Sequence, residues 1–291
     1  MGLDKNGVKL LLHAKQLDVK FDRVATIGRQ MLYIREKEMK HMLIQAGLNE
    51  AGREESFKLN SYAEAFLRKL GAERTDSLDA SAYEEASIIH DMNHPLTKEL
   101  FSKYSVVIDG GSLEHVFNFP TAIKNCMDLL EKDGYYIGIT PANNFLGHGF
   151  YQFSPELYYR IFSEVNGFKV RKMYLYADHK TASFYEVLDP LALKQRVTMA
   201  NSSPSYLFIL AQKTEDKEVF KALPQQSDYE HIVWNQAALD HISHKQKASN
   251  SKVAKLKRLL IDLYHRHIRP MGNSNPQFIR KIDLDLSVTK T

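Results

Sequence analysis

Hydrophobic and polar positions alternate with two different periods along the first 213 residues. Short aliphatic and β-branched runs predict buried strands, and stretches with an apolar residue every three or four positions predict amphipathic helices. We expect a strand that ends at Gly28 and further strands over 73–79, 87–92, 104–109, 135–140, 168–176 and 205–211. We expect helices over 7–17, 31–47, 61–71, 119–132 and 155–164.

This alternation of strands and helices predicts an α/β fold. Right-handed crossovers between the strands give a doubly wound, mostly parallel sheet with helices on both faces. The strand over 104–109 is apolar through its middle, as a strand buried on both faces should be. The segment 177–201 between the last two strands has no clear helical pattern, so we expect those two strands to pair antiparallel.

Composition and charge narrow the class of protein. The chain is 44% hydrophobic and 25% charged, which is enough to bury a core and argues against disorder or a disulfide scaffold. Its one cysteine, Cys126, excludes an intramolecular disulfide and a thiolate metal cluster. No apolar run approaches the roughly 20 residues that cross a bilayer, and the N-terminus has no signal-peptide pattern. We therefore expect a cytoplasmic protein. The net charge of +4 is too mild to indicate a nucleic-acid partner.

The character of the chain changes after Lys213. We expect one domain over 1–213 and a helical, basic C-terminal extension over 214–291. Within it, 251–269 predicts a basic amphipathic helix with one apolar stripe. That helix either docks on an anionic membrane surface or a partner, or packs on the sheet of its own domain or on a dimer interface; the second alternative is favoured. The sequence does not indicate an oligomeric state.

Candidate binding residues follow the predicted strands, because ligands of open α/β sheets bind at the carboxyl ends of the strands. Glycines such as Gly28 and Gly110 let a ligand approach the backbone closely. A carboxylate at Asp79 suits a ribose diol, and one at Asp91 suits an adenine amino group. The pattern predicts a site for an adenosine-containing cofactor. The alternative is that Asp79 caps the next helix and Asp91 begins a turn.

The order of these elements resembles the class I S-adenosylmethionine-dependent methyltransferases. The likeness is carried by Asp79 after the second strand, by His90-Asp91-Met92 after the third and by Leu113-Glu114-His115-Val116 just past the fourth. The passage 129–135 is similar to the family's helix-to-strand turn. The resemblance covers roughly 20–213 and is closest to bacterial methyltransferase-like proteins of surface-polysaccharide and small-metabolite pathways. It implies seven strands with the last antiparallel, and a donor lying over strands one to four.

The resemblance implies S-adenosylmethionine as the cofactor. The expected cofactor-binding residues are Gly28, Arg29, Gln30, Asp79, Asp91, Met92, Gly110 and Gly111. The family's first loop usually reads Gly-x-Gly-x-Gly, whereas this chain keeps the single glycine Gly28 there. Backbone contacts at Gly28 and Gly110 can still hold the donor. The alternative is a catalytically inactive, methyltransferase-like binding or scaffold protein.

The residues expected to bind and activate the methyl acceptor follow the fourth and fifth strands. A hydroxyl acceptor needs a base, and His148 and His115 are the expected catalytic residues. The loop 144–153 mixes glycines and aromatics, as a lid or acceptor wall would. Glu114, Asn144 and Tyr151 are the expected substrate-binding residues. The alternatives are that Glu114 only opens a helix and His148 is only solvated.

The remaining histidines do not form a ligand set in the sequence, and no metal is expected. The predicted function is methyl transfer to a hydroxyl, less favourably an amine, of a small polar metabolite such as a nucleotide-linked sugar. A nucleic-acid methyltransferase that grips its substrate with the basic tail is disfavoured by the mild charge. It is disfavoured also because no base-flipping motif of the Asn-Pro-Pro-Tyr type follows the fourth strand.

Overall fold

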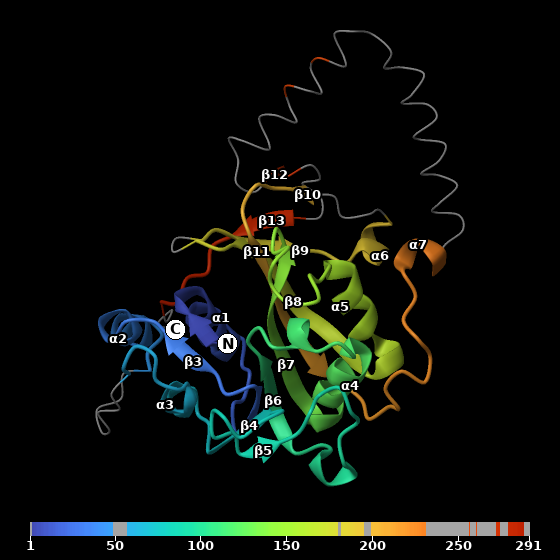
Figure 1. The fold of residues 1–291 in the computed structure, drawn as a ribbon. Coiled ribbons are helices and arrows are strands. Elements are labelled where there is room, and N and C mark those ends of the chain that lie inside the picture. Colours follow the sequence, from blue (N-terminus) through green and yellow to red (C-terminus); the bar gives the residue numbers. More distant parts are fainter. Residues whose placement is uncertain are drawn as a thin grey trace.

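The computed structural model describes residues 2–48, 57–179, 182–194, 199–230, 256, 260, 272–273 and 279–287. In this part of the chain a nine-stranded sheet runs through the centre in the order β13-β9-β8-β11-β7-β6-β2-β4-β5 (Figure 1). Its strands are β2 (Arg23–Ile27), β4 (Arg74–Asp79), β5 (Ile88–Ile89), β6 (Tyr104–Asp109), β7 (Leu130–Asn143), β8 (Phe168–Ala177), β9 (Phe184–Val187), β11 (Ser205–Lys213) and β13 (Ile279–Ile282).

The sheet confirms the expected doubly wound α/β fold. From β2 the chain adds β4 and β5 on one side and then β6 and β7 on the other, all of them parallel. The strand order therefore reverses between β2 and β6, and such a switch point leaves a crevice at the carboxyl ends of the two strands. The expected antiparallel pairing of the last two strands is also confirmed, since β11 pairs antiparallel with both β7 and β8.

The expectation of seven, mostly parallel strands is wrong in two respects. The described sheet has nine strands, because β9 and β13 extend it beyond β8. Four of its eight neighbouring pairs are antiparallel. Parallel pairs need a crossover such as a helix, whereas a chain that turns back directly pairs antiparallel. That is the case for the step from β8 to β9.

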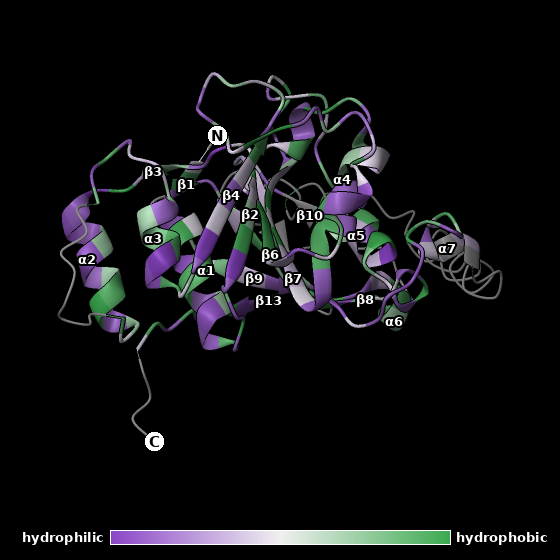
Figure 2. Ribbon diagram, turned by 90° about the horizontal axis from the view of Figure 1, so that it is seen from below, coloured by the Kyte–Doolittle hydropathy of each residue, from purple (hydrophilic) through white to green (hydrophobic). Residues whose placement is uncertain are grey.

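Helices cover both faces of the sheet (Figure 2). On one face lie α1 (Lys5–Gln16), α2 (Glu36–Gln45) and α3 (Glu64–Lys69), and on the other lie α4 (Phe119–Leu129) and α5 (Pro155–Ile161). Two short helices, α6 (Pro190–Leu193) and α7 (Ser227–Glu230), follow. The side chain of Asp4 caps α1 by accepting from the Gly7 amide, and Ser154 caps α5 in the same way.

The core consists of two apolar layers that share the sheet. Along β11, Phe208 and Leu210 face the α1–α3 layer while Leu207 and Ile209 face the α4–α5 layer. This alternation is the period of two of an extended strand. Because both faces are buried, the central strands are apolar at nearly every position, which is the signal that predicted them.

Several helix boundaries differ from the expectation, three of them as follows. Residues 31–33 form the short strand β3 (Met31–Tyr33), which pairs with β1 (Gly2–Asp4), so that helix begins only at Glu36. The helix expected from Ser61 begins at Glu64: the Ser61 hydroxyl donates to the Lys58 carbonyl, and no side chain caps the helix. The helix expected to reach 132 ends at Leu129, where β7 begins.

The expected C-terminal extension is described in part. Of the expected basic helix 251–269, only Leu256 and Leu260 are described; both are helical and exposed. β12 (Gly272–Asn273) pairs with β10 (Met199–Ala200), and β13 pairs with β9. The domain boundary at 213 stays a prediction. Within the described residues, no helix has both the length and the apolar character to cross a bilayer.

Candidate functional site

Glu114 is a buried carboxylate at the carboxyl end of β6. It lies in a single 3-10 turn (Leu113–His115) and is 0% exposed. Neither of its carboxylate oxygens has a hydrogen-bond partner. Burial raises the pKa of Glu114 to about 8, and the nearby charge of Asp109 adds to the shift. Asp109 ends β6, and its own pKa is also raised by burial. Two neighbouring buried acids resist ionising together, so this end of β6 favours a cation or a retained proton.

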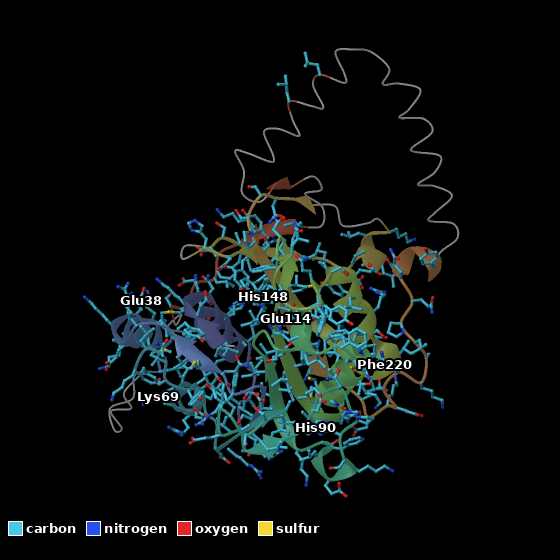
Figure 3. The ribbon with its side chains drawn as sticks, viewed as in Figure 1. Glu38, Lys69, His90, Glu114, His148 and Phe220 are labelled. Atoms are coloured by element: carbon cyan, nitrogen blue, oxygen red, sulfur yellow. The ribbon has the colours of Figure 1, made fainter. Side chains whose placement is uncertain are left out.

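His148 approaches that carboxylate from the loop after β7. Its Nε2 lies 3.5 Å from Oε1 of Glu114, and its ring centroid lies 5.0 Å from that of His115 (Figure 3). Burial and the neighbouring His148 lower the pKa of His115. One ligand-type atom from each of Glu114, His115 and His148 falls within 4.8 Å of the others. The two histidines expected as bases and the expected substrate residue Glu114 therefore lie together.

Backbone contacts hold the His148 loop against Glu114. The amides of Phe150 and Tyr151 donate to the Glu114 carbonyl over 2.8 Å and 3.2 Å. Gly149 has a φ of 72°, and a Cβ there would lie 2.8 Å from that same carbonyl oxygen. Only glycine fits so close a crossing in this conformation. The sequence pattern of His148 followed by glycine is thus what places the imidazole at the carboxylate.

Asn144 and Tyr151 shape the same loop. The Asn144 amide donates to the Ser203 carbonyl over 3.0 Å, which ties the loop to the start of β11. The Tyr151 hydroxyl donates to the Phe117 carbonyl over 2.7 Å. Both side chains were expected to contact substrate, and in the structure their polar atoms bond to the chain itself.

Two glycines stand at the switch point between β2 and β6, where a doubly wound sheet leaves a crevice. Gly28 follows β2 with a φ of 68°, and its amide donates to the Leu78 carbonyl. Gly110 follows β6, and a Cβ added to it would collide with the side-chain amide of Gln30. Gly110 therefore leaves the space in which the Gln30 side chain lies.

Gln30 is the side chain that enters the crevice. It is buried, and its Nε2 donates to the Ile27 carbonyl over 2.8 Å and to the Gly28 carbonyl over 3.3 Å. Its Oε1 is buried without a hydrogen-bond partner. Buried polar atoms are nearly always bonded, so an orphan carbonyl oxygen facing Gly110 is a position for a ligand donor.

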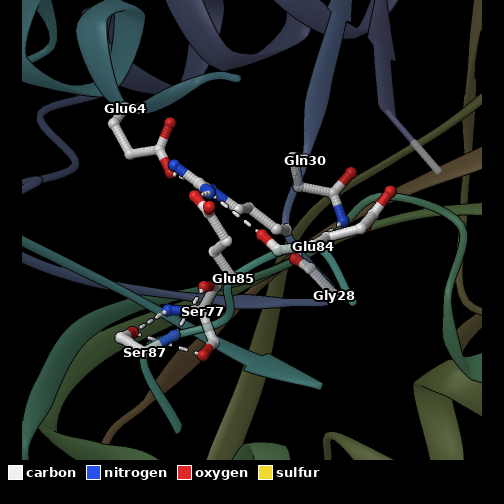
Figure 4. Close-up of polar contacts among 8 residues, drawn as sticks. Gly28, Gln30, Glu64, Ser77, Glu84, Glu85 and Ser87 are labelled. Atoms are coloured by element: carbon white, nitrogen blue, oxygen red, sulfur yellow. Dashed lines mark hydrogen bonds and ion pairs between the residues drawn. The ribbon is translucent and has the colours of Figure 1, made fainter. Parts of the chain in front are cut away.

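Arg29, which was expected in the same loop, points elsewhere. Its Nε donates to Glu64 over 2.8 Å and its Nη1 donates to the Glu84 carbonyl over 2.9 Å (Figure 4). The guanidinium also lies 3.8 Å from the centre of the Tyr62 ring. Arg29 thus joins the β2 loop to the region of α3 and to the loop after β4. Its charge is already paired.

The two acids expected to bind the adenosine part lie at the ends of neighbouring strands. Asp79 ends β4, is half-buried, and accepts from the Ser81 amide over 3.1 Å. Asp91 follows β5, is exposed, and accepts from the Asn93 amide, which lowers the pKa of Asp91. Met92 is 5% exposed and packs in the core of the α4–α5 layer. Gly111 has a φ of 89° and lies against the Glu114 carboxylate.

A cavity of about 610 Å³ opens at the base of the loop that carries His148. It lies between α5, the end of β7, the first residue of β11 and the segment 224–227. Phe153, Leu157 and Leu175 give it apolar walls, and the remaining wall is polar with Asn143, Ser154, Arg160 and Asn201 among its residues. Its size is that of a small-molecule site. Asn143 and Phe153 flank the loop that carries His148, so the two ends of that loop line the cavity.

Asp109 and the unpartnered Gln30 oxygen were not singled out from the sequence. Asp109 ends the apolar strand β6, and the sequence does not show that its carboxylate is buried. No local pattern shows that the side chain of Gln30 reaches Gly110, which lies 80 positions further along the chain. The juxtaposition of Glu114 and His148 was missed for the same reason. It depends on a loop that returns over the end of β6.

No protein-family model matches the chain, and no curated protein matches it. Among solved structures, the chain is similar to a SAM-dependent methyltransferase from Aquifex aeolicus at 11% identity, over 70% of this chain and 92% of that one, with a TM-score of 0.36. It is similar to the branched-chain polyamine synthase of Thermus thermophilus at 13% identity, over 77% and 60%, with a TM-score of 0.36. It is also similar to a 1,6-didemethyltoxoflavin-N1-methyltransferase of Burkholderia thailandensis at 14% identity, over 72% and 78%, with a TM-score of 0.32. Values this low carry no assignment of function.

Proposed function

We propose that the protein transfers a methyl group from S-adenosylmethionine to a hydroxyl of a small polar metabolite. The observation that carries the proposal is the β2–β6 switch point, where Gly28 and Gly110 follow the two strands and the buried Oε1 of Gln30 has no hydrogen-bond partner. Cofactors of doubly wound sheets bind at this point of the fold. The bound donor would supply a sulfonium-activated methyl group.

The residues present fit such a donor. The Gln30 Oε1 is free to accept from the ammonium of the amino-acid part. The Asp79 carboxylate lies one strand further along the same edge and keeps acceptor capacity for a ribose diol beyond its one bond from Ser81. Asp91 follows the next strand, where the adenine would lie. Arg29, being paired with Glu64, supports the loop and contacts no part of the donor in this proposal.

The acceptor hydroxyl would be activated at the cluster of Glu114, His115 and His148. In the transfer, an oxygen lone pair forms the new bond to the methyl carbon, and the carbon–sulfur bond breaks with its electron pair left on sulfur. The hydroxyl proton leaves at the cluster. Such an in-line displacement depends chiefly on holding the two reactants close together, and the Glu114 carboxylate lies against Gly111, the residue after Gly110.

The neighbouring cavity suits the rest of the acceptor. Its mixture of apolar walls, amide and hydroxyl groups and the Arg160–Glu156 ion pair fits a compact molecule with several hydroxyls, such as the sugar of a nucleotide-linked sugar. The amide oxygen of Asn143 can accept there and the hydroxyl of Ser154 can donate. The assignment to surface-polysaccharide precursors is part of this proposal.

One observation favours a second candidate function, a non-catalytic binding or scaffold protein. The Gln30 side chain already lies against Gly110, and the loop keeps a single glycine. If the glutamine does not move or does not bond to the donor, the crevice is closed by the chain's own amide. Donor binding separates the two candidates.

Titration calorimetry of the untagged protein with S-adenosylmethionine and with S-adenosylhomocysteine tests the proposal. We expect saturable binding at one site per chain. Asp79→Ala should weaken it about tenfold or more, since it removes the carboxylate from the ribose diol, with an unchanged Tm. Asp79→Asn keeps the turn to Ser81 and serves as the control for folding. Absence of heat at high protein concentration would remove the enzymatic proposal and leave the scaffold.

A further inference from the structure

The cluster of Glu114, His115 and His148 has the composition of a metal centre. Two imidazoles and one carboxylate are the ligand set that catalytic sites use for divalent first-row transition metals when they leave coordination positions open. We propose that these three side chains bind one such ion. Binding of the ion does not depend on the proposed function; only a role of the ion in activating the methyl acceptor rests on that function.

The distance between the two nearest ligands fits an ion better than a hydrogen bond. The Nε2 of His148 lies 3.5 Å from Oε1 of Glu114, beyond the usual range of an N–H···O bond. Two ligands of a tetrahedral ion, each bound at about 2.1 Å, lie about 3.4 Å apart. The spacing is therefore that of two atoms with an ion between them.

The state of Glu114 is the second, independent observation. Its side chain is 0% exposed, and both carboxylate oxygens lack a hydrogen-bond partner. A buried carboxylate without bonds is costly unless a cation lies at it. Gly111 leaves room at the same oxygen, since a Cβ there would stand 3.2 Å from Oε1 of Glu114. A cation at this carboxylate would therefore offset the cost of burying it.

The histidines complete the set from the solvent side. His115 and His148 are both exposed, and the atoms offered by the three residues span at most 4.8 Å. Because these imidazoles stand at the surface, rotation of their side-chain bonds closes the remaining distance. Three protein ligands would leave further coordination positions of the ion free for an acceptor. Such an ion would hold the acceptor oxygen and ease the loss of its proton to water.

Metal binding by the untagged, chelator-treated full chain tests the proposal. We expect calorimetry with Zn²⁺ to give one site per chain, and Co²⁺ to develop visible absorption bands typical of mixed nitrogen and oxygen ligands. Glu114→Gln, His115→Ala and His148→Ala should each weaken binding at least about tenfold. His41→Ala, an exposed histidine on α2, is the matched control and should bind as the wild type does.

Two results would overturn the proposal: no Zn²⁺ binding by the wild type, or His148→Ala binding as tightly as the wild type. If Glu114→Gln fails to fold, the two exposed histidines still decide the outcome. S-Adenosylmethionine binding is measured on the same chelated sample. Donor binding without metal binding refutes the metal site alone, and metal binding without donor binding refutes the proposed function alone.

Discussion

The carbonyl oxygen of Glu114 lies directly against the α-carbon of Gly149, so that a Cβ at 149 would stand 2.8 Å from it. This contact is what lets the loop after β7 cross the end of β6 and place His148 at the Glu114 carboxylate. A backbone crossing between two loops thus assembles the cluster, and the first prediction concerns that crossing.

Gly149→Ala should detach the His148 loop from Glu114. The substitution adds a Cβ in a left-handed conformation and against a carbonyl, at a cost on the order of 1–2 kcal/mol. We expect faster hydrogen exchange at the Phe150 amide, which donates to Glu114, and weaker metal binding. Gly147→Ala is the control, since a Cβ there meets nothing within 4 Å. Equal effects at both positions would contradict the role given to Gly149.

Gly110→Ala should destabilise the protein through Gln30. The new methyl group would overlap the side-chain amide of Gln30, and overpacking of this kind costs about 1–3 kcal/mol. Urea unfolding of Gly110→Ala, Gln30→Ser and the double variant measures the coupling. We expect Gln30→Ser to recover most of the loss, because it removes the overlapping atoms. Additive effects would mean that the two residues do not share the crevice.

Glu114 should make the stability fall as the pH rises. The folded-state pKa of Glu114, raised to about 8, exceeds its ordinary value of 4.5, so the folded chain holds a proton that the unfolded chain has lost. The contribution of protonated Glu114 to the free energy of unfolding is complete below pH 4.5 and disappears as the pH rises to 8. The free energy of unfolding of the wild type should therefore fall by on the order of 2–4 kcal/mol between pH 4.5 and pH 8.

The neutral variant Glu114→Gln isolates that effect. Denaturant unfolding in the presence of a chelator, between pH 6.5 and 8.5, is the measurement. This range lies above the pKa of about 6 for Asp109 and above that of His115, which burial lowers. We expect a falling stability in the wild type and a nearly flat one in Glu114→Gln. Parallel curves would show that Glu114 is ionised at neutral pH without cost.

Arg29→Met should lower stability by about 1–2 kcal/mol. Methionine keeps the length of the stem but removes the bond to Glu64, the bond to the Glu84 carbonyl and the cation over Tyr62. Thermal unfolding, with the exposed Lys20→Met as control, measures the loss. The difference should shrink in high salt, because the Glu64 side chain is partly exposed. An unchanged Tm would show that the three segments hold together without Arg29.

The periodicity of the chain predicted most of the strands and helices. β6 and β11 are continuous apolar runs, so burial on both faces is visible in their residues. The three-residue strands β1 and β3 were missed. So short a strand shows no periodicity in the sequence and can be recognised only from its pairing with another strand. The edge strands β9 and β13 were missed as well, because their pairing joins segments about 95 positions apart.

By itself, the sequence determined the doubly wound sheet and the residues that end its strands, because strand and helix periods depend on local spacing alone. Tertiary structure alone decided what those residues do. It turned Arg29 into an ion pair, placed Gln30 over Gly110 and brought His148 to Glu114. The physical reason is that burial and close approach of side chains depend on segments far apart in the chain. The sequence places Glu114 next to His115, but it does not show whether water reaches the Glu114 carboxylate.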